Sequence, residues 1–238
     1  MLNISNMKKT GSNYQSSVIY ASCKPWHKPF FDSLKSKFDW NWIYVSTPSE
    51  LDDVIGDANP RYIFFLHWNW LVPEAIWKLH ECVCFHMTDV PYGRGGSPLQ
   101  NLILAGHKET KLTALRMVSE MDAGPVYTKR PLQLEGTAQE IYVRAGALSA
   151  DIIEWMIEDE PVPIDQVGEV VLFKRRKPEQ SRLPETGSLQ STYDFIRMLD
   201  ADGYPCAYLV HGEFTLKLSK AKLENGRLIA EVEINKQS

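Results

Sequence analysis

The sequence predicts an α/β fold built on a parallel sheet, followed by a small α+β module. Short apolar segments rich in β-branched and aromatic residues alternate with helical segments through the first two thirds of the chain. Thr47 with Glu50, and Thr137 with Glu140, form the Thr-x-x-Glu pattern that caps the start of a helix. Beyond about residue 165 the pattern changes to that of a helix followed by antiparallel strands.

The elements of the first part follow one another mostly as strands separated by helices. We expect strands at 16–22, 40–46, 61–68, 82–86, 110–118 and 124–134, and helices at 29–38, 49–57, 73–79, 97–106 and 137–158. Apolar strands of this kind are typical of a parallel sheet that is buried on both faces. In such sheets, ligands bind beyond the carboxyl ends of the strands. His67, His86 and the turn at 119–124 fall at or just beyond strand ends, which makes this edge the expected functional site.

The last part of the chain predicts a separate module at 165–238, after a main domain at 1–160. Its first stretch, 173–188, is polar and contains several prolines, which favours a loop. Helical spacing of apolar residues follows at 191–201. Three strands are expected within 207–235, and the dipeptide Asn225-Gly226 marks a hairpin turn between two of them.

Composition is that of an ordinary globular protein, with 44% hydrophobic and 24% charged residues among 238. Cys82 and Cys84 are the only cysteines close together, which is a poor zinc signal, so we expect reduced thiols, no metal and a cytoplasmic location. The N-terminus lacks the apolar core of a secretory signal, and no apolar run suits a membrane span. The net charge is −4 and the last module carries equal numbers of acidic and basic residues. We therefore expect no nucleic-acid or membrane partner.

A glycine-rich loop at 91–98, PYGRGGSP, follows the strand that ends at His86. It matches neither the spacing of a P-loop nor that of a dinucleotide-binding loop, and many such segments are only tight turns. Ser97 and Pro98 are typical of a helix start, whose free N–H groups can hold an anion together with Arg94. The pattern by itself leaves both interpretations open.

His86 and Asp122 are the candidate pair for proton transfer. A carboxylate beside a histidine orients the ring and stabilises its charged form. Each residue alone has an ordinary explanation, because strand histidines are mostly structural and aspartate is common in turns. The motif H-x-T-x-x-P-x-x-R-G-x-x-P-x-Q at 86–100, followed by M-D-A-G-P-V at 121–126, supports a joint role.

These two motifs resemble the formyltransferases that use N10-formyltetrahydrofolate. Segment 64–76 resembles the family's folate-lining strand and loop, and segments 173–183 and 193–209 resemble the start of its C-terminal domain. The resemblance implies a Rossmann-like catalytic domain and transfer of a formyl group to a primary amine without a metal. It implies that His86 is the base and that Asp122 orients or charges it. It further implies that Trp70, Leu71, Val118 and Glu120 contact the folate, and that Tyr92, Arg94, Gly95 and Ser97 bind the acceptor.

The chain departs from the family at one position, because the family's asparagine in Asn-x-His is Cys84 here. Alternation along a strand places Cys84 and His86 on one face, so Cys84 borders the site. The family's asparagine polarises the formyl carbonyl, whereas a thiol is a weak donor. Thr88, Asn101, Asn69 and backbone N–H groups are the candidates to replace it. A thiol nucleophile is disfavoured, since the family reaction needs no covalent enzyme intermediate.

The loop sequence, the chain length and the neutral C-terminal module favour a small acceptor over tRNA. The string at 86–101 most resembles formyltransferases of nucleotide-activated 4-amino-4,6-dideoxy sugars, in particular those of pseudaminic-acid-type glycan biosynthesis. The expected partner is therefore a nucleotide sugar, with a homodimer as a candidate assembly. The alternatives are formylation of methionyl-tRNA, hydrolysis of formyltetrahydrofolate, and a non-catalytic folate or nucleotide-sugar binder.

Overall fold

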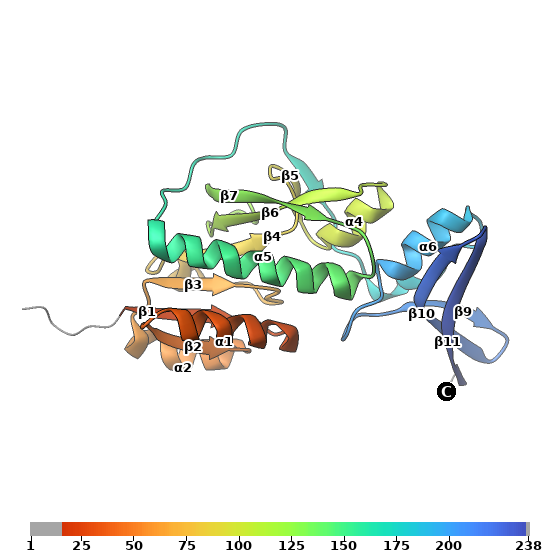
Figure 1. The fold of residues 1–238 in the computed structure, drawn as a ribbon, viewed down its shortest axis with the longest axis horizontal. Helices are drawn as coiled ribbons and strands as arrows, with labels where there is room; N and C mark the ends of the chain where they lie inside the picture. The colour runs from red at the N-terminus through yellow and green to blue at the C-terminus, as the bar shows by residue number, and fades with distance from the viewer. Residues whose placement is uncertain (1–15, 237–238) are drawn as a thin grey trace, which may run out of the picture.

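The computed structural model describes residues 16–236, in which a six-stranded sheet has the strand order β2-β1-β3-β4-β6-β7 (Figure 1). Residues 1–15, where we expect no secretory signal, lie outside this range. The strands are β1 (Ser17–Ala21), β2 (Asn41–Val45), β3 (Tyr62–Phe65), β4 (Cys82–His86), β6 (Glu109–Arg116) and β7 (Val126–Gln133). The strands β1 to β4 pair in parallel, as predicted. By contrast, β6 pairs antiparallel with both β4 and β7, so the sheet is mixed.

The antiparallel pair follows from the short turn between β6 and β7. A parallel connection needs a crossover of a dozen or more residues, whereas this turn is a hairpin connection. Gly124 in the turn lies against β6, where an added Cβ would come within 1.8 Å of the Arg116 carbonyl oxygen. Only glycine fits that position, which explains the glycine in the Met-Asp-Ala-Gly-Pro segment.

Helices cover both faces of the sheet, as its apolar strands predict (Figure 1). The helices are α1 (Lys28–Lys37), α2 (Pro48–Ala58), α3 (Glu74–Trp77), α4 (Pro98–Leu104) and α5 (Ala138–Asp159), with a short 3-10 turn at Pro25–His27. The α1 and α5 side chains pack in one apolar cluster and those of α2 and α3 in the other. Thr47 and Thr137 each accept a hydrogen bond from the backbone N–H three residues on, so both predicted caps are confirmed.

The C-terminal module contains α6 (Leu189–Arg197) and the antiparallel strands β9 (Ala207–His211), β10 (Phe214–Glu224) and β11 (Arg227–Lys236). Asn225 and Gly226 have positive φ angles and form the predicted hairpin turn. Buried Arg197 joins the module to the main sheet, since it donates to the carbonyl oxygens of Leu134 and Gly136 at 2.6 and 2.9 Å.

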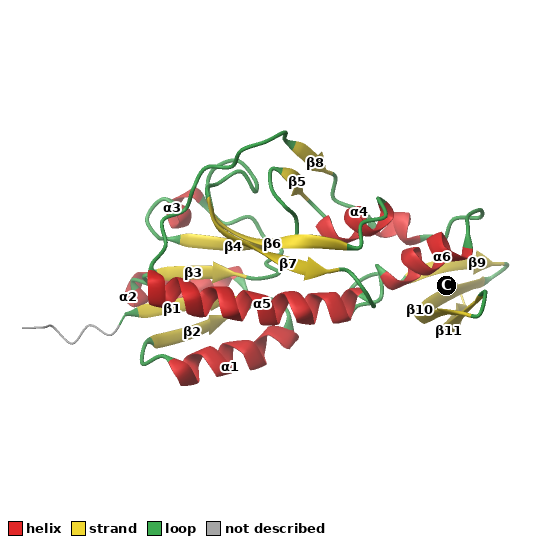
Figure 2. Cartoon of the chain, turned by 45° about the horizontal axis from the view of Figure 1, so that its top comes forward, coloured by secondary structure: helices red, strands yellow, loops and turns green. Residues whose placement is uncertain are grey.

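The sequence did not predict a small two-stranded ladder over the glycine-rich loop. β5 (Tyr92–Gly95) pairs in parallel with β8 (Val171–Phe173), apart from the main sheet (Figure 2). A Cβ at Gly95 would come within 2.4 Å of the Phe173 carbonyl oxygen, so glycine permits this close approach. A 3-10 turn (Pro178–Ser181) follows β8. Among residues 16–236, no helix is long and apolar enough to cross a membrane.

Candidate active site

A cavity of about 490 Å³ opens at the carboxyl edge of the sheet, where the sequence predicts the functional site. Ligand cavities in proteins commonly measure about 300–1,000 Å³. Three of the non-glycine residues with positive φ angles, His67, Ser97 and Asp122, line it. Such strained backbone conformations concentrate at functional sites, which makes this cavity the candidate active site.

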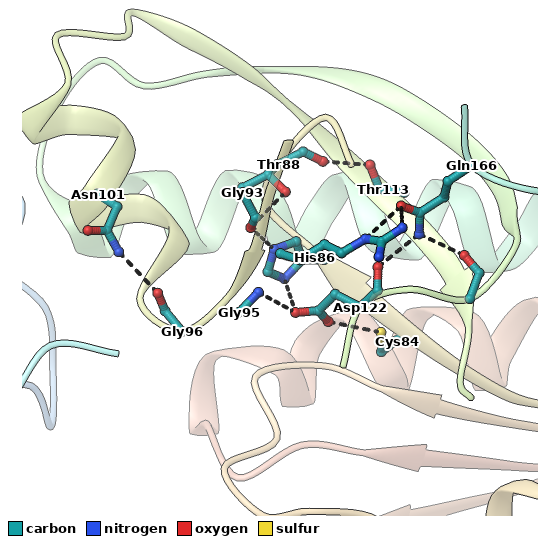
Figure 3. Close-up of polar contacts among 12 residues, drawn as sticks. Cys84, His86, Thr88, Gly93, Gly95, Gly96, Asn101, Thr113, Asp122 and Gln166 are labelled. Atoms are coloured by element: carbon teal, nitrogen blue, oxygen red, sulfur yellow. Dashed lines mark hydrogen bonds and ion pairs between the residues drawn. The ribbon is translucent and has the colours of Figure 1, made fainter. Parts of the chain in front are cut away.

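His86 is the last residue of β4 and its side chain is almost completely buried. Its Nε2 lies 2.7 Å from the carbonyl oxygen of Gly93 in β5 (Figure 3). Because a carbonyl oxygen only accepts hydrogen bonds, Nε2 carries the hydrogen in the neutral ring. The lone pair of neutral His86 is therefore on Nδ1, which lies 3.5 Å from Oδ2 of Asp122. The fold brings the predicted pair together and leaves Nδ1 as the atom that can accept a proton.

Asp122 is held in place from two sides. The backbone N–H of Gly95 donates to Oδ2 at 2.9 Å, and the Cys84 thiol lies 4.0 Å from Oδ1 (Figure 3). The carboxyl group is thereby held where it can stabilise His86 when Nδ1 gains a proton. Gly95 therefore positions Asp122, a role that the sequence did not predict for Gly95.

Cys84 lines the cavity on the same face of β4 as His86, as alternation predicts. Burial and the neighbouring Asp122 carboxylate hold the pKa of the Cys84 thiol well above its ordinary value. The sulfur is therefore a protonated thiol at neutral pH, and thiols react as nucleophiles in the thiolate form. This agrees with the expectation that Cys84 is not a nucleophile.

The structure distinguishes among the three side chains considered as replacements for the missing asparagine. Asn101 uses its amide donor for the carbonyl oxygens of Gly96 and Ser97 at 3.1 and 2.9 Å. Thr88 is fully buried, is not among the cavity-lining residues, and donates to Gly93. These two expectations are corrected, because both side chains are committed to holding the loop. Asn69 is exposed and lines the cavity, so it remains a candidate.

The residues expected to bind the acceptor divide into two groups. Gly95 and Ser97 line the cavity, whereas Arg94 and Tyr92 do not. The hydroxyl of Tyr92 pairs with Nε2 of His107 at 3.2 Å, away from the cavity. Arg94 is only 8% exposed, which does not fit its predicted role as a surface anion contact. Both residues therefore support the loop instead.

Arg94 has two side-chain partners, Glu120 at 3.4 Å and Gln166, and sequence patterns did not identify Gln166. Its Oε1 accepts hydrogen bonds from Nε and Nη2 of Arg94 at 3.1 and 2.9 Å. Its Nε2 donates to the carbonyl oxygens of Asp122 and Gly124, both at 2.8 Å (Figure 3). Gln166 thus connects the glycine-rich loop to the turn that carries the catalytic candidate Asp122.

Part of the cavity wall consists of exposed apolar and aromatic side chains. All four residues predicted to contact folate line this cavity, namely Trp70, Leu71, Val118 and Glu120. Trp70 meets Trp68 edge to face at 5.0 Å between ring centroids, and Leu71 is 84% exposed. Apolar and aromatic walls with a few polar groups are typical of cavities that bind small ligands.

A buried relay of three hydrogen-bonding side chains reaches the cavity at His67. The Tyr20 hydroxyl lies 3.1 Å from Nδ1 of His27, and Nε2 of His27 lies 2.8 Å from Nδ1 of the cavity-lining residue His67. Burial raises the pKa of Tyr20, lowers that of His27 to about 4 and lowers that of His67 well below its ordinary value. Nε2 of His67 is buried and has no hydrogen-bond partner among residues 16–236.

Among the residues that the structure describes, no group of three or more His, Cys, Asp or Glu side chains could hold a metal ion. The functional groups at the cavity are a histidine with a free Nδ1 lone pair, an ionisable carboxylate and a protonated thiol. In an α/β fold with the site at the carboxyl edge of its strands, this set of groups is suited to group transfer by general acid–base chemistry.

Comparisons with known proteins agree with this class. Residues 178–235 match the family model described as the methionyl-tRNA formyltransferase C-terminal domain. A solved structure described as methionyl-tRNA formyltransferase from Clostridium thermocellum is 42% identical, with a TM-score of 0.90 over 93% of this chain and 99% of that one. HypX from Aquifex aeolicus, solved in complex with tetrahydrofolic acid, shares the fold at 17% identity and a TM-score of 0.71, over 88% of this chain and 38% of that one.

Methionyl-tRNA formyltransferase of Rickettsia massiliae is 27% identical over 197 residues, which cover 77% of this chain. The match spans only 64% of the length of that relative. The 42% identity over nearly all of the Clostridium chain establishes the family. The chain belongs to the formyltransferase family that includes the methionyl-tRNA formyltransferases.

The prediction of a nucleotide-sugar partner and of no nucleic-acid partner was wrong. The Clostridium and Rickettsia relatives are both named for methionyl-tRNA. The prediction rested on the loop sequence, the chain length and the neutral net charge of the last module. Net charge averages over a whole module and hides local runs of one sign. Residues 174–177 read Lys-Arg-Arg-Lys within a module whose charges sum to zero.

Proposed function

We propose that the chain transfers a formyl group from N10-formyltetrahydrofolate to the amino group of methionyl-tRNA. The observation that carries the proposal is the His86–Asp122 pair, with Nδ1 of His86 free to accept a proton inside the cavity. The similarity to proteins named methionyl-tRNA formyltransferase supports the choice of acceptor.

The folate supplies an activated formyl carbon to this reaction. A primary amine attacks only in its neutral form and loses a proton as the new C–N bond forms. His86 accepts that proton on Nδ1 and becomes an imidazolium with acceptors on both sides, Asp122 at Nδ1 and Gly93 at Nε2. Asp122 stabilises this charged ring, and the imidazolium can return the proton to the departing nitrogen of the folate.

Negative charge develops on the formyl oxygen during the attack and needs a hydrogen-bond donor. The protonated thiol of Cys84 lines the cavity but is a weak donor. Asn69, which is exposed at the cavity, is the side-chain amide positioned to supplement it. We therefore expect this chain to stabilise the developing charge less well than a relative with asparagine at the position of Cys84.

The test is release of tetrahydrofolate by the purified protein, with and without methionyl initiator tRNA. We expect release that depends on the tRNA and that falls about 100- to 10,000-fold in His86→Ala, the range typical of general-base loss. His211→Ala is the matched control, since His211 is exposed on β9 and outside the cavity. Release that needs no acceptor indicates a hydrolase, and no release from any variant indicates a folate binder.

A further inference from the structure

His67 carries an unused hydrogen-bonding atom at the cavity wall. It is the second residue after β3, its φ angle is positive, and it lines the cavity. Nδ1 of its ring lies 2.8 Å from Nε2 of His27, whereas its own Nε2 is buried and has no hydrogen-bond partner among residues 16–236. Buried polar atoms are almost always hydrogen-bonded, so an exception at a cavity wall indicates an atom that a ligand can use.

The neighbours of His67 hold both its backbone and its ring. The Cys23 thiol donates to the backbone carbonyl oxygen of His67 at 2.8 Å. His27, which contacts the ring of His67, is fixed in turn by the Tyr20 hydroxyl 3.1 Å from its Nδ1. The ring of Tyr142 packs edge to face with that of His67, with 4.7 Å between the centroids. A group held in this way loses little conformational freedom when it binds a ligand.

His67 is uncharged at neutral pH. Burial, and to a smaller extent the charges of His27 and Lys24, keep the pKa of His67 well below its ordinary value. Nε2 of the neutral ring is a donor or an acceptor, depending on which nitrogen carries the hydrogen. Because a neutral ring offers no charge to a phosphate or a carboxylate, an uncharged polar group is its suitable partner in either form.

The cavity is lined from both faces of the sheet, and His67 belongs to a different face from Cys84. Tyr142, the ring neighbour of His67, is part of the apolar cluster that contains α1 and α5. Cys84 packs against the cluster of α2 and α3, together with Trp68 and Val72 of the segment that is expected to line the folate site. His67 therefore lies on the side that is left for the acceptor.

We propose that His67 positions the acceptor through a hydrogen bond between its Nε2 and an uncharged polar atom of the aminoacyl group. This inference rests on the proposed function, since it names a residue that holds the acceptor of that reaction. The aminoacyl group has an ester carbonyl that accepts hydrogen bonds and an amine that donates them, so it offers a partner to either form of Nε2. Phe65 of β3 pairs with Cys84 of β4, so His67 and His86 come from neighbouring strand ends and line one cavity.

The experiment compares His67→Phe and His67→Gln with the wild type. Phenylalanine keeps a ring at this position but removes Nε2, whereas glutamine retains an amide that both donates and accepts. Dissociation constants are measured without folate for methionyl initiator tRNA and for uncharged initiator tRNA, and KM is measured for methionyl-tRNA and for the folate. His211→Phe is the matched control, since His211 is exposed on β9 and outside the cavity. Thermal unfolding midpoints verify that the variants fold.

We expect the wild type and the control to bind methionyl-tRNA about 10- to 100-fold more tightly than uncharged tRNA, the range expected when a buried hydrogen-bonding group gains its partner. His67→Phe should reduce this preference at least about tenfold and raise KM for methionyl-tRNA similarly, with the folate KM and the affinity for uncharged tRNA unchanged. His67→Gln should recover part of the preference.

Three results would overturn the inference while the proposed function stands: an unchanged preference in His67→Phe, an equal loss of affinity for both tRNAs, or no recovery in His67→Gln. The second and third would assign His67 a role in packing alone. A wild-type protein that does not formylate methionyl-tRNA would overturn both the inference and the proposed function.

Discussion

Nδ1 of His86 lies 3.5 Å from Oδ2 of Asp122, while Nε2 of the same ring is fixed 2.7 Å from the carbonyl oxygen of Gly93. The Gly93 contact determines which nitrogen carries the hydrogen, so the basic nitrogen is the one that faces the carboxylate. A proton accepted at Nδ1 therefore arrives beside a negative charge, and the ring does not need to rotate. The proton is therefore accepted on the same side of the His86 ring on which Asp122 lies.

Asp122→Asn is expected to lower kcat about 100- to 10,000-fold, because the uncharged amide no longer stabilises the His86 imidazolium. The measurement is the initial rate of tetrahydrofolate release with saturating acceptor. Asp89→Asn serves as the control, since Asp89 is an exposed carboxylate paired with Lys129 outside the cavity. A normal rate for Asp122→Asn would exclude charge stabilisation as the role of Asp122.

Cys84→Asn is expected to raise kcat about tenfold or more, because a single oxyanion donor is worth about 100- to 1,000-fold in other enzymes and a thiol supplies little of this. The KM for folate should change little, since the gain is made in the transition state. Cys206→Asn, at a half-buried cysteine outside the cavity, is the matched control. If Cys84→Asn is no faster, other groups such as Asn69 already provide the stabilisation.

Gln166→Ala is expected to lower stability by about 2 kcal/mol, since it removes the hydrogen bonds that Gln166 accepts from Arg94 and those that it donates to the carbonyl oxygens of Asp122 and Gly124. It should also lower kcat, because the turn that carries Asp122 loses its connection to the glycine-rich loop. Urea unfolding and steady-state rates measure the two effects. Gln133→Ala, on the exposed surface of β7, should change neither. A stability loss with normal kcat would restrict Gln166 to a structural role.

The buried His27 predicts that stability falls as the pH is lowered from about 6.5 to about 4. Its pKa is about 4 in the folded chain and 6.5 ordinarily, so the unfolded chain binds more protons in this window. The free energy of unfolding therefore rises with pH, and the difference between the two pKa values corresponds to about 3 kcal/mol. The contribution is complete above pH 6.5.

Urea unfolding of the wild type and of His27→Gln at pH 5 and pH 7 measures this contribution. The wild type should lose more stability on acidification than His27→Gln, although the variant starts lower because it disturbs the contacts with Tyr20 and His67. His211→Gln, at an exposed position, should follow the wild type. Equal pH dependence in the wild type and His27→Gln would show that His27 is not kept neutral by burial.

Local sequence patterns predicted most of the fold. The caps at Thr47 and Thr137 and the hairpin turn at Asn225 were confirmed, because each depends on residues that are close in sequence. The strand that ends at His86 could also be recognised from its apolar residues. Because the carboxyl ends of parallel strands meet at one edge of a sheet, its end indicated where the cavity would lie. The antiparallel direction of β6 could not be predicted, because it depends on which strands pair with each other and not on their composition.

Parts of the site that depend on distant segments could not be predicted. The ladder between β5 and β8 joins stretches that are separated by a long helix, and neither has a clear strand pattern. Arg94 was expected to bind the acceptor because it is a cation in a glycine-rich loop. Its burial against Gln166 appears only in three dimensions. The partner was predicted wrongly because a loop sequence, a chain length and a net charge do not identify an acceptor, and net charge averages over local runs such as 174–177.

The most direct test of the account is the identity of the formylated product. The protein is incubated with N10-formyltetrahydrofolate and, in parallel, with methionyl initiator tRNA, uncharged initiator tRNA or free methionine. Mass spectrometry then follows formylmethionine, which is released from the tRNA by mild base. We predict formylmethionine only from methionyl-tRNA, and its loss in His86→Ala. Absence of formylmethionine from methionyl-tRNA with the wild-type protein would contradict the account.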